Sequence, residues 1–153
     1  MKIRGFEFVD YKFIKGELPN KLPTRGTNKS AGYDFYSPID IDIQPQQQVK
    51  FQLNVKAYMQ DDEVLEIHIR SSLGFKYQLI LSNCTGIIDS DYYNNPNTGG
   101  NIGIAIRNLG DKTFHINKGD RICQGIFKKY LLADEDKPLS TNRIGGYGST
   151  GGN

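Results

Sequence analysis

Apolar and polar residues alternate along most of this chain with a period of two. Apolar side chains recur at every second position in five runs, within residues 39–43, 49–55, 65–69, 102–106 and 114–116. This period is typical of β-strands with one buried face, because successive side chains point to opposite sides of a sheet. Each run is bounded by turn-forming residues such as Pro, Gly, Asn and Asp. The pattern therefore predicts an all-β fold of many short strands: a barrel, a sandwich or a jelly roll.

Helical periodicity is nearly absent. No segment keeps a 3.6-residue apolar period for more than about two turns. Residues 71–78 fit either a short helix or an irregular loop, and the sequence leaves both open.

Composition narrows the class of protein. A chain of 153 residues is expected to form one domain, and only 37% of its residues are hydrophobic. Association of identical subunits would bury further strand faces. The net charge of +2, without a basic run, argues against direct nucleic-acid binding, and no apolar stretch is long enough to predict a membrane span. Cys84 and Cys123 lack metal-ligand spacing, so we expect reduced thiols in a cytoplasmic protein.

An acidic residue ends one apolar run in the segment of residues 83–93. The run Gly86–Ile88 continues directly into Asp89, with Asp91 and Tyr92 close behind. A carboxylate at the end of a buried strand needs partners or a role, and it can deprotonate a water as a general base. The alternative is that Asp89 and Asp91 cap a turn, and this segment alone favours that alternative.

Two further segments have side chains suited to phosphate. Arg70-Ser71-Ser72 combines a guanidinium with two hydroxyls. The alternative is an Arg70–Glu66 surface pair with Ser71 capping a short helix. Gln124 follows the turn of residues 119–121 on the apolar face of a predicted strand, where an amide is either a hydrogen-bonded core residue or a ligand contact.

Asp34 and the C-terminal tail complete the candidate chemistry. Asp34 lies in an aromatic-rich predicted strand, so we expect a buried partner for it, such as an arginine. The tail, residues 143–151, offers an arginine, bare backbone amides, two hydroxyls and one aromatic ring. These groups suit a phosphate-bearing ligand and indicate a lid that orders on binding. A merely flexible terminus is the alternative.

Together these segments resemble the five ordered motifs of the trimeric deoxyuridine triphosphate nucleotidohydrolase (dUTPase) family. The matching segments are Ala31–Phe35, Arg70–Ser72, Gly86–Tyr92, Gly119–Gln124, and Arg143 with Gly145–Gly151. The resemblance runs nearly the whole length of the chain, and the loop of residues 92–97 is similar to that of the branch found in Gram-positive bacteria and their phages.

The resemblance implies a dUTPase-like β jelly roll (β-clip) over residues 1–141 and a flexible glycine-rich lid over residues 142–153. It implies a homotrimer with three shared active sites. The implied reaction is Mg²⁺-dependent cleavage of dUTP to dUMP and pyrophosphate, which keeps uracil out of DNA and supplies dUMP for thymidylate synthesis. The metal would be held mainly by substrate phosphates and waters, so no protein ligand to it is expected.

The resemblance also implies roles for particular residues. Asp89 is the catalytic residue, which positions the attacking water and holds the 3′-hydroxyl. Tyr92 packs against the sugar and excludes a 2′-hydroxyl, Tyr147 stacks on uracil, and Arg143 clamps the γ-phosphate from a neighbouring subunit. The implied substrate-binding set is Arg70, Ser71, Ser72, Asn83, Gly86, Ile88, Tyr92, Gln124, Arg143, Gly146, Tyr147, Gly148, Ser149 and Thr150.

One departure and two rival functions accompany the resemblance. Only Ile144 separates Arg143 from Gly145, where the family often has two residues. The related dCTP deaminases need a glutamate about where Ala105 stands, which argues against deamination. A regulatory protein on the same scaffold, binding a partner through residues 93–100, is the other rival.

Overall fold

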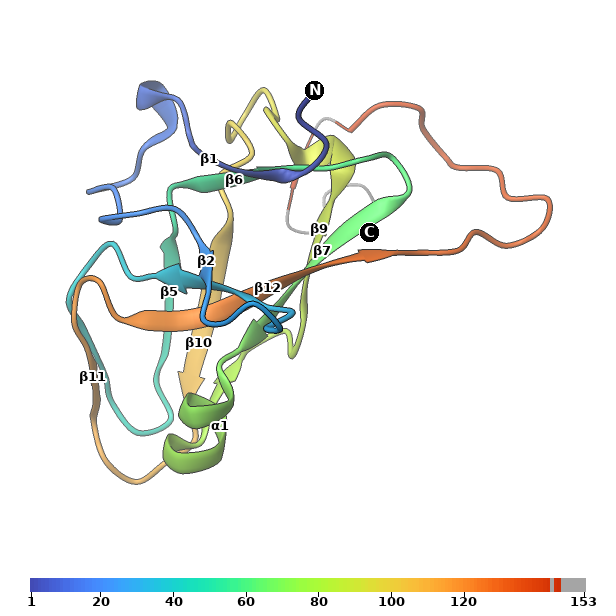
Figure 1. The fold of residues 1–153 in the computed structure, drawn as a ribbon. Helices are drawn as coiled ribbons and strands as arrows, with labels where there is room; N and C mark the ends of the chain where they lie inside the picture. Colours follow the sequence, from blue (N-terminus) through green and yellow to red (C-terminus); the bar gives the residue numbers. More distant parts are fainter. Residues whose placement is uncertain (144, 147–153) are drawn as a thin grey trace.

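An antiparallel sheet of five strands carries Gly86, Ile88, Asp89 and Gln124 of the predicted site residues. The computed structural model describes residues 1–143 and 145–146 of the chain. In spatial order the sheet consists of β2 (Thr24–Arg25), β3 (Tyr33–Tyr36), β12 (Arg121–Lys129), β7 (Glu63–Ile69) and β9 (Gly86–Asp89). Figure 1 shows β12 and β7 crossing at the centre of the molecule. β7 therefore has a neighbour on both sides, whereas β9 forms an edge.

Three smaller antiparallel sheets complete the β-structure of the described residues. β10 (Gly103–Asn108) lies between β5 (Gln48–Gln52) and β8 (Leu79–Leu81). β1 (Gly5–Phe8) pairs with β6 (Val55–Tyr58), and β11 (Phe114–Ile116) pairs with β4 (Ile41–Ile43). The predicted all-β architecture is confirmed.

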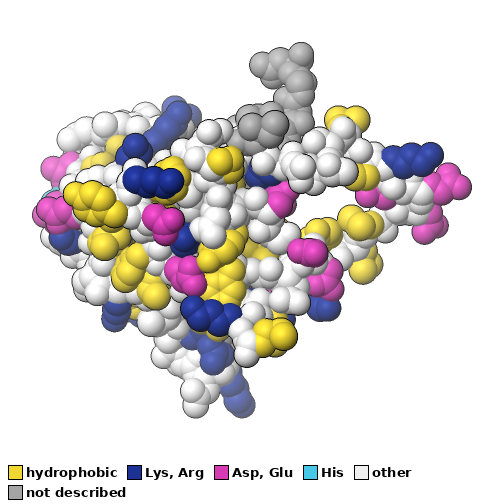
Figure 2. Space-filling view, turned by 90° about the horizontal axis from the view of Figure 1, so that it is seen from above, with side chains coloured by type: hydrophobic (Ala, Val, Ile, Leu, Met, Phe, Trp, Pro, Cys, Tyr) yellow, Lys and Arg dark blue, Asp and Glu magenta, His cyan; other side chains and the backbone are white. Residues whose placement is uncertain are grey.

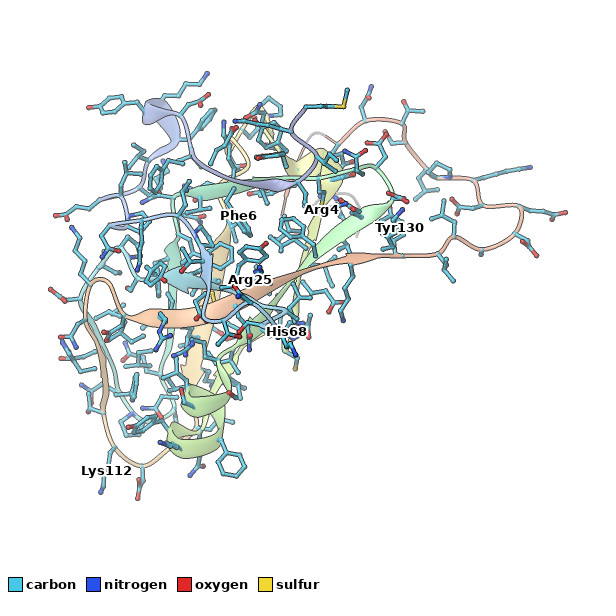
Figure 3. All side chains as sticks on the ribbon, viewed as in Figure 1. Arg4, Phe6, Arg25, His68, Lys112 and Tyr130 are labelled. Carbon is cyan, nitrogen blue, oxygen red and sulfur yellow. The ribbon has the colours of Figure 1, made fainter. Side chains whose placement is uncertain are left out.

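The core lies between these sheets and is built from the alternating apolar positions. Each of the five predicted runs supplies at least one side chain with 1% exposure or less: Ile43, Leu53, Val55, Leu65, Ile67, Ile102, Ile106 and Ile116. Phe6 attaches the β1–β6 pair to the large sheet, with ring centroids 5.2–5.4 Å from those of Tyr33, Phe35 and Phe127. Figure 3 labels Phe6 in this position. Offset and edge-to-face aromatic packing of this kind adds stability beyond area burial.

The run predicted over residues 49–55 is divided into two strands. Asn54 has a left-handed backbone with a φ of 58°, so the chain turns between β5 and β6. Asparagine tolerates this conformation better than most residues because its short polar side chain bonds locally. Apolar alternation does not report the turn, since Leu53 and Val55 are both buried on either side of it.

The helical elements are short, as the sequence predicts. Residues 71–78 resolve in favour of a helix, α1 (Ser71–Tyr77), which ends at the left-handed residue Gln78. Two 3₁₀ turns also occur, η1 (Tyr11–Phe13) and η2 (Ser90–Tyr92).

After β12 the chain forms an arm, residues 130–142, which projects from the body in Figure 1 and stands clear of it at the right of Figure 2. Three leucines along it, Leu131, Leu132 and Leu139, are 70–97% exposed. Such exposed apolar side chains are typical of a surface that contacts another chain.

Candidate active site

The two ends of β7 hold two different groups of the predicted site residues. Asp89 on β9 lies opposite Val64, near the start of β7. Arg70 directly follows Ile69, the last residue of β7. Arg70 lies six positions after Val64 along the extended chain, which corresponds to about 20 Å. The base candidate and the phosphate candidates of one chain are therefore well separated.

At the Arg70 end, two arginines converge on one buried carboxylate. Arg70 Nε donates to Asp34 Oδ1 over 3.0 Å, and Arg121 lies 3.6 Å from Asp34 Oδ2. The Asp34 side chain is only 13% exposed. The buried arginine partner predicted for Asp34 is found, and the alternative Arg70–Glu66 pair is wrong, because Glu66 bonds His68 and Lys128 instead. With two cations on one anion, this cluster carries a net positive charge suited to phosphate oxygens.

Gln124, Ser71 and Ser72 lie near the same end of β7. Gln124 lies opposite both Asp34 on β3 and His68 on β7. Its amide packs against Gly32, where a Cβ would collide with Oε1. Ser71 and Ser72 form the first turn of α1, and the N-cap position belongs to Arg70 rather than to Ser71. The capping role considered for Ser71 is therefore wrong.

A cavity of about 1180 Å³ opens along β9, from Gly86 opposite Ile67 to Asp89 near the other end of β7. Its walls include Phe51, Ile67, Leu81 and Ile104 from the apolar core region. The predicted site residues that line it are Asn83, Gly86, Ile88, Asp89, Tyr92, Arg143 and Gly146. Polar and charged side chains also line it, and a concave site that combines apolar walls with polar groups is typical of small-molecule binding.

Asp89 is half-exposed at this cavity and is paired with the tail. Arg143 donates to the carboxylates of Asp89 and Asp91, with 2.6 Å from Nε to Asp91 Oδ1. The guanidinium is 13% exposed, whereas the Asp89 and Asp91 side chains are 49% and 57% exposed. Burial opposes the charge of Arg143, but the hydrogen bond to Asp91 and the charges of both acids outweigh it and raise the pKa of Arg143.

The sequence predicted that Asp89 ends a buried strand. This prediction is wrong, because β9 is an edge strand. Asp89 precedes η2, yet its side chain makes no capping hydrogen bond, so the turn-capping alternative is wrong for Asp89 as well.

Tyr92 forms part of the cavity wall and is held at its far end. The side chain is buried, and its hydroxyl donates to the Asn101 carbonyl over 2.8 Å. A Cβ at residue 146 would lie 2.9 Å from the Tyr92 ring, so glycine allows the tail to approach the ring closely.

The cavity also has polar lining residues that sequence patterns did not single out. Lys15 and Lys50 contribute cations, and Ser82 contributes a hydroxyl that is buried without a hydrogen-bond partner. Lys15 comes from an irregular segment and Lys50 from the polar face of β5, so neither stands out in the sequence.

Part of the predicted lid lies outside the residues that the structure describes. This part includes Ile144, Tyr147, Gly148, Ser149 and Thr150. Within residues 1–143 and 145–146, no three His, Cys, Asp or Glu side chains are grouped as ligands of a metal ion. No helix in the same part of the chain is long and apolar enough to cross a membrane. Cys84 and Cys123 are free thiols, the first exposed and the second buried.

Comparisons with known proteins place this architecture in one family. The family model for dUTPase matches residues 19–151. The deoxyuridine 5′-triphosphate nucleotidohydrolase of Lactococcus lactis subsp. lactis is 42% identical over 152 residues, with 99% of each chain covered. That of Haemophilus influenzae is 32% identical, with 94% of this chain and 97% of the relative covered.

Solved structures agree with this placement. The crystal structure of the dUTPase from Streptococcus mutans has a TM-score of 0.73 at 41% identity, with 85% of this chain and 98% of that chain covered. The dUTPase of Staphylococcus bacteriophage 80alpha, at 21% identity and a TM-score of 0.68, shares the fold over 99% of both chains.

The chain belongs to the dUTPase family. The family predicted from the five motifs, the jelly-roll fold and the enzyme class are thereby confirmed.

Proposed function

We propose that this chain hydrolyses dUTP to dUMP and pyrophosphate, with Asp89 as the general base. The observation that carries the proposal is the half-exposed Asp89 carboxylate at a large cavity, beside the Arg143 guanidinium. Through this reaction the protein keeps uracil out of DNA and supplies dUMP for thymidylate synthesis. We place it in the cytoplasm.

Asp89 accepts a proton from one water molecule. The water oxygen forms a bond to the phosphorus of the nucleoside monophosphate unit while the bond to the pyrophosphate oxygen breaks on the opposite side. An ordinary carboxylate is a weak base, so the reaction depends on positioning and on stabilising the charge of the phosphates. The exposure of Asp89 supports this role, since a water can reach its free oxygen.

The nucleoside occupies the cavity. The hairpin of residues 83–88 reads uracil, with Asn83, Gly86 and Ile88 on the cavity wall. Tyr92 packs against the deoxyribose and excludes a 2′-hydroxyl. The tail closes the site: Tyr147 stacks on uracil, and Arg143, Ser149 and Thr150 bind the γ-phosphate. Arg143 exchanges its carboxylate partners for phosphate oxygens, which make equally strong charge-assisted bonds with a guanidinium.

The donor chemistry fits a magnesium ion that arrives with the nucleotide. Asp89 is the carboxylate that lines the cavity, and we assign it to the water rather than to the metal. Mg²⁺ would be held mainly by the substrate phosphates and waters, as it is in many nucleotide sites. When bound, the ion neutralises phosphate charge and orients the triphosphate. The chain's own residues bind the nucleoside, position the water and close the site.

The phosphates are bound by a second copy of the chain in a homotrimer with shared active sites. No described residue lines both the large cavity and the small hollow beside Arg70 and Arg121. The roughly 20 Å along β7 between the two groups is too far for the two phosphates that follow the reacting one. Arg70, Ser71, Ser72 and Gln124 of a neighbouring subunit would complete the site, and the exposed leucines of the arm support such association.

Two other functions on this scaffold are less well supported. Deamination of dCTP needs a proton-shuttling glutamate, but the corresponding position on the cavity wall is Ala105. A regulatory role through residues 93–100 would have a small exposed surface, because only Asn94, Pro96 and Asn97 of this loop are exposed.

Pyrophosphate release in the presence of Mg²⁺, from dUTP beside UTP, dTTP and dCTP, tests the proposal. We expect fast turnover of dUTP alone. Release of ammonia from dCTP would indicate a deaminase instead. An absence of turnover with all four nucleotides would contradict the proposal.

A further inference from the structure

A buried lysine outside all five motifs contacts the loop that follows Tyr92, a residue of the cavity wall. Lys56 on β6 is 4% exposed. Burying an ammonium group is costly unless it is paired and hydrogen-bonded. Its partners come from two separate segments of the chain, the end of β1 and the loop of residues 92–101.

The first set of contacts holds Lys56 to the N-terminal region. Glu7 is its direct cross-strand neighbour in the β1–β6 pair, with a carboxylate oxygen 3.9 Å from Nζ. Asp10 accepts a hydrogen bond from Nζ over 3.1 Å. These carboxylates compensate the buried charge, and they fix the position of the ammonium group.

The second set of contacts extends from Lys56 to the 92–101 loop. Nζ donates to Asn94 Oδ1 over 2.7 Å and lies 5.1 Å from the centre of the Tyr93 ring, within the range of a cation–π interaction. The Tyr93 hydroxyl donates to Glu7 over 2.7 Å. This bond is the main cause of the raised pKa of Tyr93 and of the lowered pKa of Glu7. Figure 1 shows the β1–β6 pair alongside this loop at the top of the molecule.

Tyr92, the residue proposed to exclude a 2′-hydroxyl, directly precedes the anchored pair Tyr93–Asn94. Its ring is fixed at the far end by the hydroxyl bond to the Asn101 carbonyl. Asn101 is in turn bonded to Asn54, which is fully buried, through its side-chain amide. The loop is therefore held at two points, by Lys56 just after Tyr92 and by Asn54 at its end.

We propose that Lys56 is a positioning residue that sets the discrimination between dUTP and UTP by holding the Tyr92–Asn94 backbone in place. This inference rests on the proposed function. One hydroxyl distinguishes the two substrates, and rejecting an added hydroxyl by sterics demands a rigid wall. Loss of the ammonium bridge lets the loop move outward, so the ribose of UTP fits beside Tyr92. Asp89 lies beyond η2 and retains its strand pairing with Val64.

The test measures kcat/KM for dUTP and UTP in two variants. Lys56→Met keeps the aliphatic stem and removes the charge. Asn94→Gly removes only the acceptor on the loop, and glycine readily adopts the left-handed backbone of residue 94, whose φ is 54°. We expect the dUTP/UTP ratio of kcat/KM to fall by about tenfold in Lys56→Met and by less in Asn94→Gly, mainly because kcat/KM for UTP rises. The fall cannot be much larger, since steric rejection of a hydroxyl contributes about 10² at most.

Three further measurements separate positioning from general destabilisation. Lys129→Met removes an exposed lysine paired with Asp62 and should leave the ratio unchanged. The double variant Lys56→Met/Asn94→Gly should be no less selective than Lys56→Met alone, since coupled residues are non-additive. Amide hydrogen exchange should accelerate in residues 92–101 of both single variants, and not in β12.

The outcomes distinguish the two proposals. If the wild-type chain hydrolyses dUTP selectively and both variants keep its ratio, the inference about Lys56 is wrong and the proposed function stands. If Lys56→Met does not fold, Asn94→Gly decides, because it leaves both carboxylate partners of Lys56 in place. If the wild-type chain hydrolyses neither nucleotide, the proposed function fails, and the role of Lys56 in selectivity fails with it.

Discussion

The two ends of β7 carry the same chemical pair, an aspartate bound by arginine, in opposite environments. Asp34 is 13% exposed and held by Arg70 and Arg121 from two strand ends of the same sheet. Asp89 is 49% exposed and held by Arg143 from the tail. Figure 3 labels Arg4 and His68 towards the Asp89 and Arg70 ends of β7 respectively.

The different environments of Asp34 and Asp89 indicate which of the two carboxylates is suited to act as a base. The Asp34 carboxylate, which is mostly buried and bound by two arginines, is suited to orienting those arginines rather than to reacting with water. A half-exposed carboxylate on an edge strand is accessible to water, which supports the base role proposed for Asp89. Asp34 and Asp89 are the same residue type. They differ in how exposed they are and in whether their arginine partners belong to the sheet or to the tail.

Replacing Asp89 tests the reactive side of this comparison most strongly. Asp89→Asn keeps the size of the side chain and removes its basicity, so we expect dUTP turnover to fall by about 10²–10⁴-fold with the thermal midpoint nearly unchanged. Steady-state pyrophosphate release measures the effect. Asp91→Asn is the matched control, since Asp91 shares the Arg143 partner and is similarly exposed. An equal loss in both variants would assign the effect to tail binding rather than to a base.

Removing the tail removes Arg143, the partner of Asp89, at the same end of β7. A chain truncated before Arg143 should lose about 10²-fold or more in turnover, because charge stabilisation of the phosphates is lost. Sedimentation should show the same oligomer as the full chain, with the same thermal midpoint. A monomeric or unfolded product would mean that residues 143–153 are structural.

Replacing Asp34 tests the structural side. Asp34→Asn leaves Arg70 and Arg121 facing a neutral amide, and we expect a loss of about 2–3 kcal/mol in the free energy of unfolding. This loss is below the roughly 3–5 kcal/mol that removing one partner of a fully buried ion pair costs, because Arg121 is half-exposed. Asp62→Asn, which removes an exposed partner of Lys129, should change the free energy of unfolding far less, because water screens exposed ion pairs. Similar losses in the two variants, measured by urea unfolding, would contradict the contrast between buried and exposed pairs.

These contacts also show what the sequence could and could not predict. Period-two alternation located β4, β5, β7, β10 and β11, because it depends only on which face of each strand is buried. The need of Asp34 for an arginine was predictable from its aromatic surroundings, but the choice of Arg70, 36 residues away, depends on how β3 and β7 flank β12. The exposure of Asp89 was missed because an apolar run looks the same on an edge strand as on a central one. Lys56 was missed because its partners lie 38 and 46 residues away.

A third arginine–carboxylate pair refines the comparison through its pH dependence. Glu63 begins β7 beside the Asp89 end, is 3% exposed, and accepts a hydrogen bond from Arg4 over 3.0 Å. The bond to Arg4 is the main reason that the pKa of Glu63 is lowered. A lowered folded-state pKa stabilises the protein above the unfolded value of about 4.3, and this contribution disappears as the pH falls through the folded value.

Glu63→Gln should therefore be less stable than the wild type at neutral pH, and the gap should narrow as the pH falls from about 5 to below 4. The effect is expected to be smaller than that of Asp34→Asn, because one half-exposed arginine holds Glu63 whereas two hold Asp34. Urea unfolding of both proteins across this pH range measures it. Glu66→Gln is the control, since Glu66 also has a lowered pKa but a more exposed side chain. A gap that stays constant with pH would show that Arg4 stabilises Glu63 through packing rather than through charge.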